Sequence, residues 1–170
     1  MNDQLPENFH RIDKNEPFCF ACHPGVSCFT ECCRELDLAL TPYDVLRLKN
    51  RLQIHSGTFL EQYVIMEWDE QQPFPTCYLT MVDDGRASCV FVQPKGCSVY
   101  EDRPGACRAY PVGRGASKNE DGSIEEIFVL AREPHCRGYE EKQSQTAPEY
   151  FSGQGLISYN RFNDQVMQLL

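Results

Sequence analysis

Apolar and polar positions show the spacing of a helix most clearly in the run TPYDVLRLKNRL, which begins at Thr41. Thr41 can accept a backbone hydrogen bond as the N-cap, and Pro42 suits the first helical position. Val45, Leu48 and Leu52 then fall on one face, while the basic side chains between them lie toward solvent. This pattern predicts an amphipathic helix over the whole run, with its apolar face packed against a core.

Two further stretches have helical spacing. Residues 58–68 are expected to form a second helix, whose apolar residues are Phe59, Leu60, Tyr63, Val64 and Met66. A third helix is expected at the end of the chain, with one apolar stripe formed by Tyr159, Phe162, Val166 and Leu169. We interpret these helices as scaffold, because their apolar residues have the spacing of a packed core.

The middle of the chain has the pattern of strands. The run CYLTMVDDGRASCVFV predicts two short strands around a turn at Asp83, Asp84 and Gly85. The run SIEEIFVLA predicts another strand, after the turn-rich SKNEDG. Residues 86–115 are rich in Gly, Pro, Arg and Cys and have no clear period. We expect loops there, held by something other than a backbone ladder.

Together these patterns predict a small α+β fold, cysteine-rich, loop-rich and metal-stabilised, with a few short antiparallel strands and three or four helices. Residues 1–17 are expected to be a loosely held lead-in, and residues 18–170 a single cysteine-cluster metal-binding domain. No apolar run reaches the roughly 18 residues of a membrane span. The polar start does not have the pattern of a secretory signal. We therefore expect a cytoplasmic protein.

Charge narrows the class of partner. The net charge is −9 at pH 7. Nucleic acid is a polyanion that proteins bind through Lys and Arg, so we expect no nucleic-acid partner. We also expect no membrane partner. The expected partner is a protein. The charge is unevenly distributed, because residues 86–137 sum to +1 and the rest of the chain to −10.

The cysteine content is the unusual feature, at ten in 170 residues. Reducing compartments keep thiols reduced, so this number in a cytosolic chain favours metal binding or catalysis over disulfides. Zinc, ferrous iron and iron–sulfur cores prefer thiolate ligands, and four thiolates complete a tetrahedral shell. The first set is Cys19, Cys22, Cys28, Cys32 and Cys33; Cys77 stands alone; the second set is Cys89, Cys97, Cys107 and Cys136.

The adjacent pair Cys32 and Cys33 leaves three interpretations open. Successive side chains tend to diverge, so the two thiols could supply two neighbouring metal centres. They could instead bind one metal at a sharp turn. Alternatively, Cys33 could be a small buried hydrophobic residue.

Spacing excludes several known sites. A radical-SAM site needs cysteine where Glu35 stands, and a bacterial ferredoxin needs one where Gly25 stands. The residues HPG after Cys22 disfavour the helix that a thioredoxin-like redox pair would open. His23 and His135 adjoin cysteines and could be ligands, but such residues more often hydrogen-bond locally.

Basic residues accompany the second set of cysteines. Guanidinium groups and backbone N–H donors near a negatively charged thiolate centre would stabilise it and tune its potential. We expect about half of these arginines to serve in that way and the rest to be surface charges. They are Arg103, Arg108, Arg114, Arg132 and Arg137.

Three blocks resemble a known family: FACHPG with CFTECCRELDLALTPYDVLRL, then CVFVQPKGCSVYEDRPGACRAYP, then a late HC. They are similar to the YkgJ-type cysteine-cluster proteins of bacteria, described as zinc- or iron-chelating or iron–sulfur-cluster-containing, over roughly residues 18–140. Cys19 and Cys77 stand outside the family pattern. The resemblance implies eight metal ligands, which are Cys22, Cys28, Cys32, Cys33, Cys89, Cys97, Cys107 and Cys136.

The leading hypothesis is a metalloprotein that holds an iron–sulfur cluster, for which 4Fe–4S is one form, or zinc, or one of each. Its role would be electron transfer, redox sensing or an accessory step in protein modification. An alternative is a structural-zinc interaction module whose exposed face includes Tyr100 and Tyr110. A third is a Lewis-acid enzyme, for which Glu101, Asp102 and His135 are the nearby acid–base candidates. The residues leave the question of catalysis open.

Overall fold

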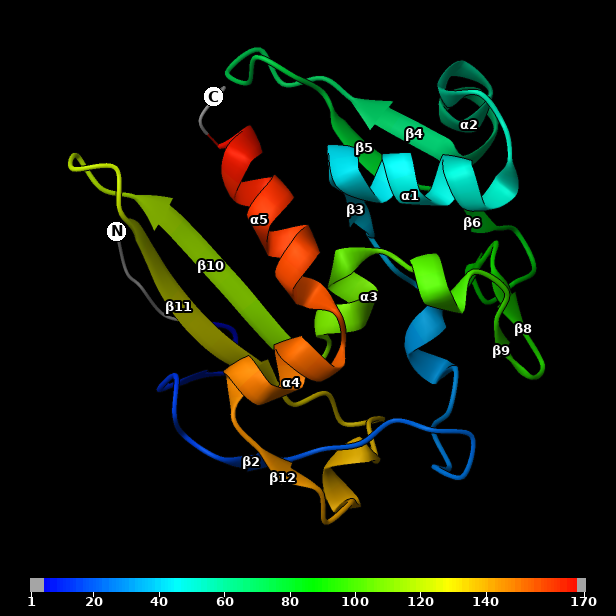
Figure 1. The fold of residues 1–170 in the computed structure, drawn as a ribbon. Helices are drawn as coiled ribbons and strands as arrows, with labels where there is room; N and C mark the ends of the chain where they lie inside the picture. The colour runs from blue at the N-terminus through cyan, green and yellow to red at the C-terminus, as the bar shows by residue number, and fades with distance from the viewer. Residues whose placement is uncertain (1–4, 168–170) are drawn as a thin grey trace.

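The computed structural model of the chain describes residues 5–167, which form five α helices and several small antiparallel sheets (Figure 1). The expected α+β, cysteine-rich and loop-rich class is confirmed. The helices exceed the expected three or four because two of them, α3 and α4, are too short to show a clear period. The helices are α1 (Pro42–Leu52), α2 (Ser56–Tyr63), α3 (Gly105–Ala109), α4 (Ala147–Gly153) and α5 (Leu156–Val166).

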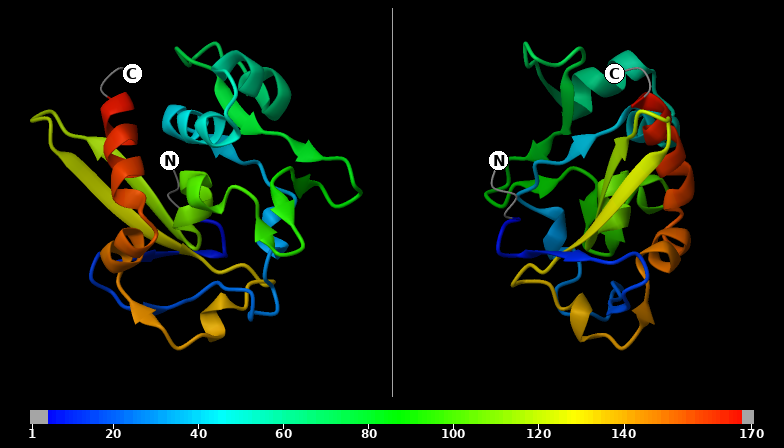
Figure 2. Two further views of the ribbon diagram at one scale, coloured as in Figure 1. Left: turned by 45° about the vertical axis from the view of Figure 1, so that its right-hand side comes forward. Right: turned by 90° about the vertical axis from the view of Figure 1, so that its left-hand side faces the viewer.

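One three-stranded sheet lies against the last two helices (Figure 2). Its order is β1 (Phe9–Ile12), β11 (Ile124–Ala131), β10 (Val112–Lys118), and all its pairings are antiparallel. Phe128 and Leu130 of β11 are buried together with Phe151 of α4 and Tyr159 of α5. We call this packed set the first core. Tyr159 confirms the expected apolar stripe of the last helix, whose residue Leu169 lies outside the described residues.

A second three-stranded sheet packs under the first two helices. Its order is β3 (Ala39–Leu40), β5 (Thr76–Leu79), β4 (Val64–Glu67), again antiparallel. Leu48 of α1 and Phe59 of α2 are fully buried there against Leu79 of β5. We call this set the second core. It confirms that the first two helices are scaffold.

Short elements connect the two cores. Three two-stranded ladders and three 3-10 turns make up this region, and most of the cysteines lie in it or beside it. The ladders are β2 (Phe18–Cys19) with β12 (Ser144–Gln145), β6 (Met81–Val82) with β7 (Ser88–Cys89), and β8 (Val92–Gln93) with β9 (Gly96–Cys97). The 3-10 turns are η1 (Glu31–Cys33), η2 (Tyr100–Asp102) and η3 (Gly138–Glu140).

A buried carboxylate fixes α3 against α1. Asp44 closes the capping box of α1, where its Oδ2 accepts hydrogen bonds from the backbone N–H and the hydroxyl of Thr41. Its Oδ1 accepts the backbone N–H of Gly105 at 2.7 Å. Burial raises the pKa of this carboxyl group, while the hydrogen bonds from Gly105 and Thr41 oppose that rise. The predicted N-terminus of the helix is therefore confirmed, and it also positions α3.

Two sequence-based expectations about helices and the lead-in need correction. Residues 64–67 form strand β4, not the end of a helix, because Val64 and Ile65 are β-branched and the segment pairs with β5. Within the expected lead-in, residues 9–12 are not loosely held but form β1 on the edge of β11. No helix within residues 5–167 has both the length and the apolar character needed to cross a bilayer.

The stretch 86–115 is more regular than its composition predicts. It contains β7, β8, β9, α3 and the start of β10, although each of these except β10 is only two to five residues long. Such short elements leave no period to detect in a sequence. The predicted turn at Gly85 is confirmed, because this residue has φ of 74° between the paired strands β6 and β7.

Candidate metal centre

A cavity of about 590 Å³ lies where the two cores meet. Phe20 and Tyr150 of the first core line one side, and Phe91 and Val99 of the second core line the other. Pockets at such junctions are the usual place for ligands and cofactors. Six cysteine side chains line this cavity: Cys22, Cys32, Cys33, Cys89, Cys97 and Cys107.

One group of thiols gathers where the first cysteine set meets the segment after β11. Cys22 lies close to Cys28, Cys32 and Cys136. A thiolate at any of these three residues would repel the thiolate of Cys22. Cys136 is coupled in the same way to Cys28 and Cys32. The backbone N–H of Arg137 also donates a hydrogen bond to the Cys28 sulfur, at 3.1 Å. Cys22, Cys28, Cys32 and Cys136 therefore form one group, which we call the first thiol group.

Backbone pairing brings Cys33 to the second cysteine set. Arg34 forms an antiparallel bridge with Ser88, and the N–H of Glu35 donates to the carbonyl of Ala87 at 3.0 Å. Continuing this register by one residue places Cys33 opposite Cys89. Residues directly opposite each other in an antiparallel pair have Cβ atoms about 5 Å apart.

Helix α3 adds the remaining member of that set. Cys107 is coupled most strongly to Cys89 and Cys97, and Cys89 to Cys97. Cys33, Cys89, Cys97 and Cys107 form the second thiol group. Cys107 is also coupled to Cys32, so the two groups are neighbours. The continued register therefore assigns Cys33 to the second group and leaves Cys32 with the first, and the two adjacent side chains hydrogen-bond to each other where the groups meet.

Backbone N–H groups face the sulfur atoms in a repeated pattern. Burial raises the pKa of Cys89, Cys97 and Cys136. In each case the backbone N–H two residues further along the chain opposes this rise, because it points at the sulfur. The donors belong to Phe91, Val99 and Gly138. Donors of this kind stabilise thiolates that bind metal.

Cys22, Cys32 and Cys107 are protonated at neutral pH when no metal is bound. Burial and the neighbouring thiolates raise the pKa of Cys22 from 9.0 to about 11. The same two causes raise the pKa of Cys107 from 9.0 to about 12. The hydrogen bond to Cys33 and burial raise the pKa of Cys32 well above its ordinary value. Binding a metal cation must therefore displace protons from these residues.

The donor set fits a thiolate-bound metal, although the thiols surround the cavity and do not converge on one point. Within residues 5–167, no three Cys, His, Asp or Glu side chains already lie in a geometry that would hold one ion. Eight thiols in two groups of four, with amide donors aimed at several sulfurs, nevertheless supply the ligands that soft metals and iron–sulfur clusters prefer. All ten cysteines are free thiols in this structure.

A buried hydroxyl lies beside the first thiol group. The Tyr110 hydroxyl lines the cavity, and it is close enough to the Cys136 sulfur that a hydrogen bond between them lowers the pKa of Cys136. Burial, then Cys136 and Glu133, raise the pKa of this tyrosine, which places its hydroxyl next to those two side chains. A negatively charged thiolate accepts a hydrogen bond more strongly than a neutral thiol, so metal binding at Cys136 would strengthen its bond to this hydroxyl. Sequence reasoning placed Tyr110 on an exposed recruiting face; in the structure it is half-buried beside the sulfur.

The two remaining cysteines lie apart from the two groups, and His23 and His135 each lie beside a glutamate. Cys19 is exposed in β2, and Cys77 of β5 faces the second core. His23 accepts a hydrogen bond from Gly25 and lies 3.6 Å from Glu141, which is the expected local role. His135 lies 3.4 Å from the Glu133 carboxylate and lines the cavity.

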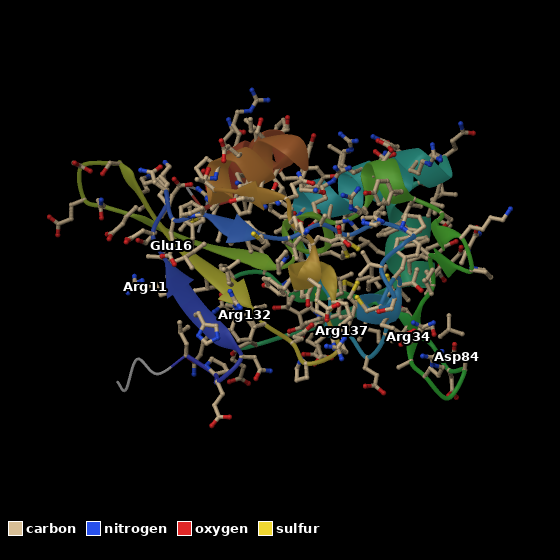
Figure 3. All side chains as sticks on the ribbon, turned by 90° about the horizontal axis from the view of Figure 1, so that it is seen from below. Arg11, Glu16, Arg34, Asp84, Arg132 and Arg137 are labelled. Atoms are coloured by element: carbon tan, nitrogen blue, oxygen red, sulfur yellow. The ribbon has the colours of Figure 1, made fainter. Side chains whose placement is uncertain are left out.

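The five arginines of the sequence argument have separate roles. Arg137 reaches the first thiol group through its backbone, and Figure 3 shows it on the same face of the molecule as Arg34, with sulfur atoms nearby. Arg103 lines the cavity and stacks on Tyr100 at 3.8 Å. The other three are structural: Arg108 bonds to carbonyl groups, Arg114 to Asp164 and Glu126, and Arg132 packs on Tyr139.

The acid–base candidates have structural partners. Asp102 accepts a hydrogen bond from Arg47 of α1 at 2.8 Å, and the backbone carbonyl of Glu101 accepts one from the same guanidinium. These contacts join η2 to α1. The third candidate, His135, instead lines the cavity together with Glu133.

Residues 21–137 match the model of the CxxCxxCC family, described as a "putative zinc- or iron-chelating domain". The match covers more than half of the chain, so the chain belongs to this family. It begins one residue before Cys22 and ends one residue after Cys136, so all eight cysteines of the two thiol groups fall inside it and Cys19 does not. A search of curated proteins and a search of solved structures returned no match to the chain.

Proposed function

We propose that this protein is an iron–sulfur protein of the cytoplasm that holds two neighbouring thiolate centres and transfers or senses electrons. One centre would be held by Cys22, Cys28, Cys32 and Cys136, the first thiol group. The other would be held by the second thiol group, Cys33, Cys89, Cys97 and Cys107. The observation that carries the proposal is the division of Cys32 and Cys33 between two groups on one cavity wall.

The cavity favours a cluster over a lone ion. A single zinc ion binds thiolates at about 2.3 Å and needs little space beyond its ligands. Here six of the thiols line a cavity of about 590 Å³, which is lined also by apolar side chains such as Phe29 and Phe91. Apolar surroundings, limited solvent and N–H donors to sulfur are the features by which a protein sets the potential of a cluster.

The residues of the chain would support such centres in three ways. The thiols lose protons and bind. The amides of Arg137, Gly138 and Val99 hold the sulfur atoms in place, and the Tyr110 hydroxyl donates to Cys136. A bound cluster supplies one-electron chemistry. Because Cys32 and Cys33 are consecutive, the two centres would be attached to residues about 3.8 Å apart at their Cα atoms, which suits electron exchange between them.

A structural-zinc interaction module is the second candidate, and one observation favours it. The segments that carry the thiols have little regular structure of their own, since η1, β7 and β9 span only two or three residues each. Binding of structural zinc can contribute on the order of 10 kcal/mol to folding. Zinc would therefore be sufficient to hold these segments together without any redox role.

Elemental analysis with a visible absorption spectrum, on protein purified without oxygen, separates the two candidates. Brown protein with iron and acid-labile sulfide supports the proposal. Colourless protein with stoichiometric zinc contradicts the redox proposal and supports the structural module. Protein that is folded and fully reduced with neither metal contradicts both.

A further inference from the structure

Strand β4 leaves one edge of the second sheet open. The sheet order is β3-β5-β4, and among residues 5–167 no strand pairs with β4 on the side away from β5. The N–H of Thr80 donates to the carbonyl of Tyr63, which places that pair in the hydrogen-bonded register. Residues alternate along an antiparallel pair, so the carbonyl of Val64 and both backbone groups of Met66 point away from β5, while the Val64 N–H closes the last turn of α2. An extended chain could bond to them.

Exposed apolar side chains accompany this open edge. Ile65 and Met66 of β4 are 53% and 47% exposed. Trp68 and Phe74, in the connection from β4 to β5, are 74% and 60% exposed. This connection projects beyond the rest of the sheet in Figure 1. Four large apolar side chains exposed within ten residues indicate a surface that is covered when a partner binds.

The Asp, Glu, Lys and Arg side chains of residues 52–85 are all acidic. No Lys or Arg occurs between Arg51 and Arg86. Proteins commonly protect an open strand edge with lysine or proline, and β4 has neither. The acidic residues nearest the edge are Glu67, Asp69 and Glu70.

We propose that the outer edge of β4 binds an extended, basic segment of a partner protein, which adds to the sheet as a further strand. Backbone bonds at Val64 and Met66 would give affinity, and Lys or Arg side chains of the segment would pair with Glu67, Asp69 and Glu70. Apolar side chains between them would cover Trp68 and Phe74. The proposal does not depend on which metal the protein binds.

Charge disfavours two other occupants. A second copy of the chain would bring the same acidic segment to the edge, with no Lys or Arg between Arg51 and Arg86 to pair with Glu67, Asp69 and Glu70. An anionic membrane surface attracts basic segments and would repel this acidic one. A basic protein segment avoids both penalties.

Trp68 provides a direct test, because it is the single tryptophan of the chain. The probe is a peptide that alternates valine and lysine, titrated into the protein as purified. We expect a saturable blue shift of the tryptophan emission, with affinity about tenfold weaker when salt is raised from about 0.05 M to about 0.5 M. A valine–glutamate peptide should cause no shift. A valine–lysine peptide with alternate amides N-methylated should bind about tenfold more weakly, because it cannot complete the ladder.

Variants locate the binding to β4. Met66→Pro removes an outward N–H and should abolish binding, and Asp69→Lys combined with Glu70→Lys should weaken it about tenfold without altering the strand. Ile157→Ser, on the exposed face of α5, should have no effect. Equal binding of the N-methylated peptide, no emission shift with the valine–lysine peptide, or sedimentation as a dimer that the charge reversal leaves intact would each overturn the proposal. Binding to anionic vesicles in preference to the peptide would also overturn it.

Discussion

The carboxylate of Asp44 accepts the backbone N–H of Gly105 at 2.7 Å, and this contact connects α1 to the helix that carries Cys107. Only 1% of Asp44 is exposed. One buried side chain therefore caps one helix and fixes the start of another. The position of a predicted metal ligand depends on it.

Asp44→Asn should destabilise the protein by about 2–3 kcal/mol, since an amide cannot accept all the hydrogen bonds that the carboxylate accepts. Denaturant unfolding measures the loss. The matched control is Glu149→Gln, which alters the same capping box in α4 at an exposed site and should cost about 1 kcal/mol or less. Equal losses in the two variants would show that the bond to Gly105 contributes nothing.

Tyr110→Phe should lower the reduction potential of the metal-loaded protein, because the variant removes a hydrogen-bond donor to the Cys136 thiolate. Electrochemical titration under anaerobic conditions measures the change. Tyr139→Phe is the control, since the Tyr139 hydroxyl donates to the carbonyl of Ala131 at 2.8 Å and not to sulfur. The control should lose stability and keep its potential. A potential that is unchanged in Tyr110→Phe would contradict the predicted donor role.

Zinc binding to the reduced protein should release protons at neutral pH. The pKa values of Cys22 and Cys107, about 11 and about 12, lie above the pH of the solution, so these thiols carry protons that the metal must displace. Affinity should therefore rise as pH rises and fall as pH falls, by up to about tenfold per pH unit for each thiol that binds. Competition with a chromophoric chelator at several pH values measures this slope.

Single substitutions test the same prediction. Cys107→Ser should reduce the number of protons released by about one, because it removes one protonated thiol from the second group. Cys77→Ser should leave the number unchanged, since Cys77 packs on the second core and no thiol of either group affects its pKa. A zinc affinity that does not depend on pH would contradict the account of protonated, metal-binding thiols.

The parts of the fold that the sequence predicts are those that local contacts decide. Thr41, Pro42 and Asp44 are all within one helical turn, so the start of α1 is visible in the sequence. The stripe of α5 is visible for the same reason. Strand β4 is not, because Val64 takes an extended conformation through its pairing with Leu79, fifteen residues further along. Local apolar spacing alone favoured the helix.

The sequence likewise predicts only part of the candidate metal site. The eight expected ligands came from the resemblance of their motifs to a known family, and those motifs did not indicate how the cysteines are grouped. The register that places Cys33 opposite Cys89 follows from a bridge between Arg34 and Ser88, which are far apart in the chain. The role of Tyr110 depends on the fold that brings it to Cys136. Every cysteine has a backbone N–H group two residues further along the chain. Only the fold shows which of these N–H groups face the sulfur atom.

The division of Cys32 and Cys33 between two centres is the central claim, and metal content with an absorption spectrum tests it most directly. Cys32→Ser and Cys33→Ser should each lose about half of the metal, and the two remaining spectra should differ because each reports a different centre. Cys77→Ser should keep the full content. Complete loss in both variants, or no loss in Cys33→Ser, would contradict the claim that adjacent cysteines serve two centres.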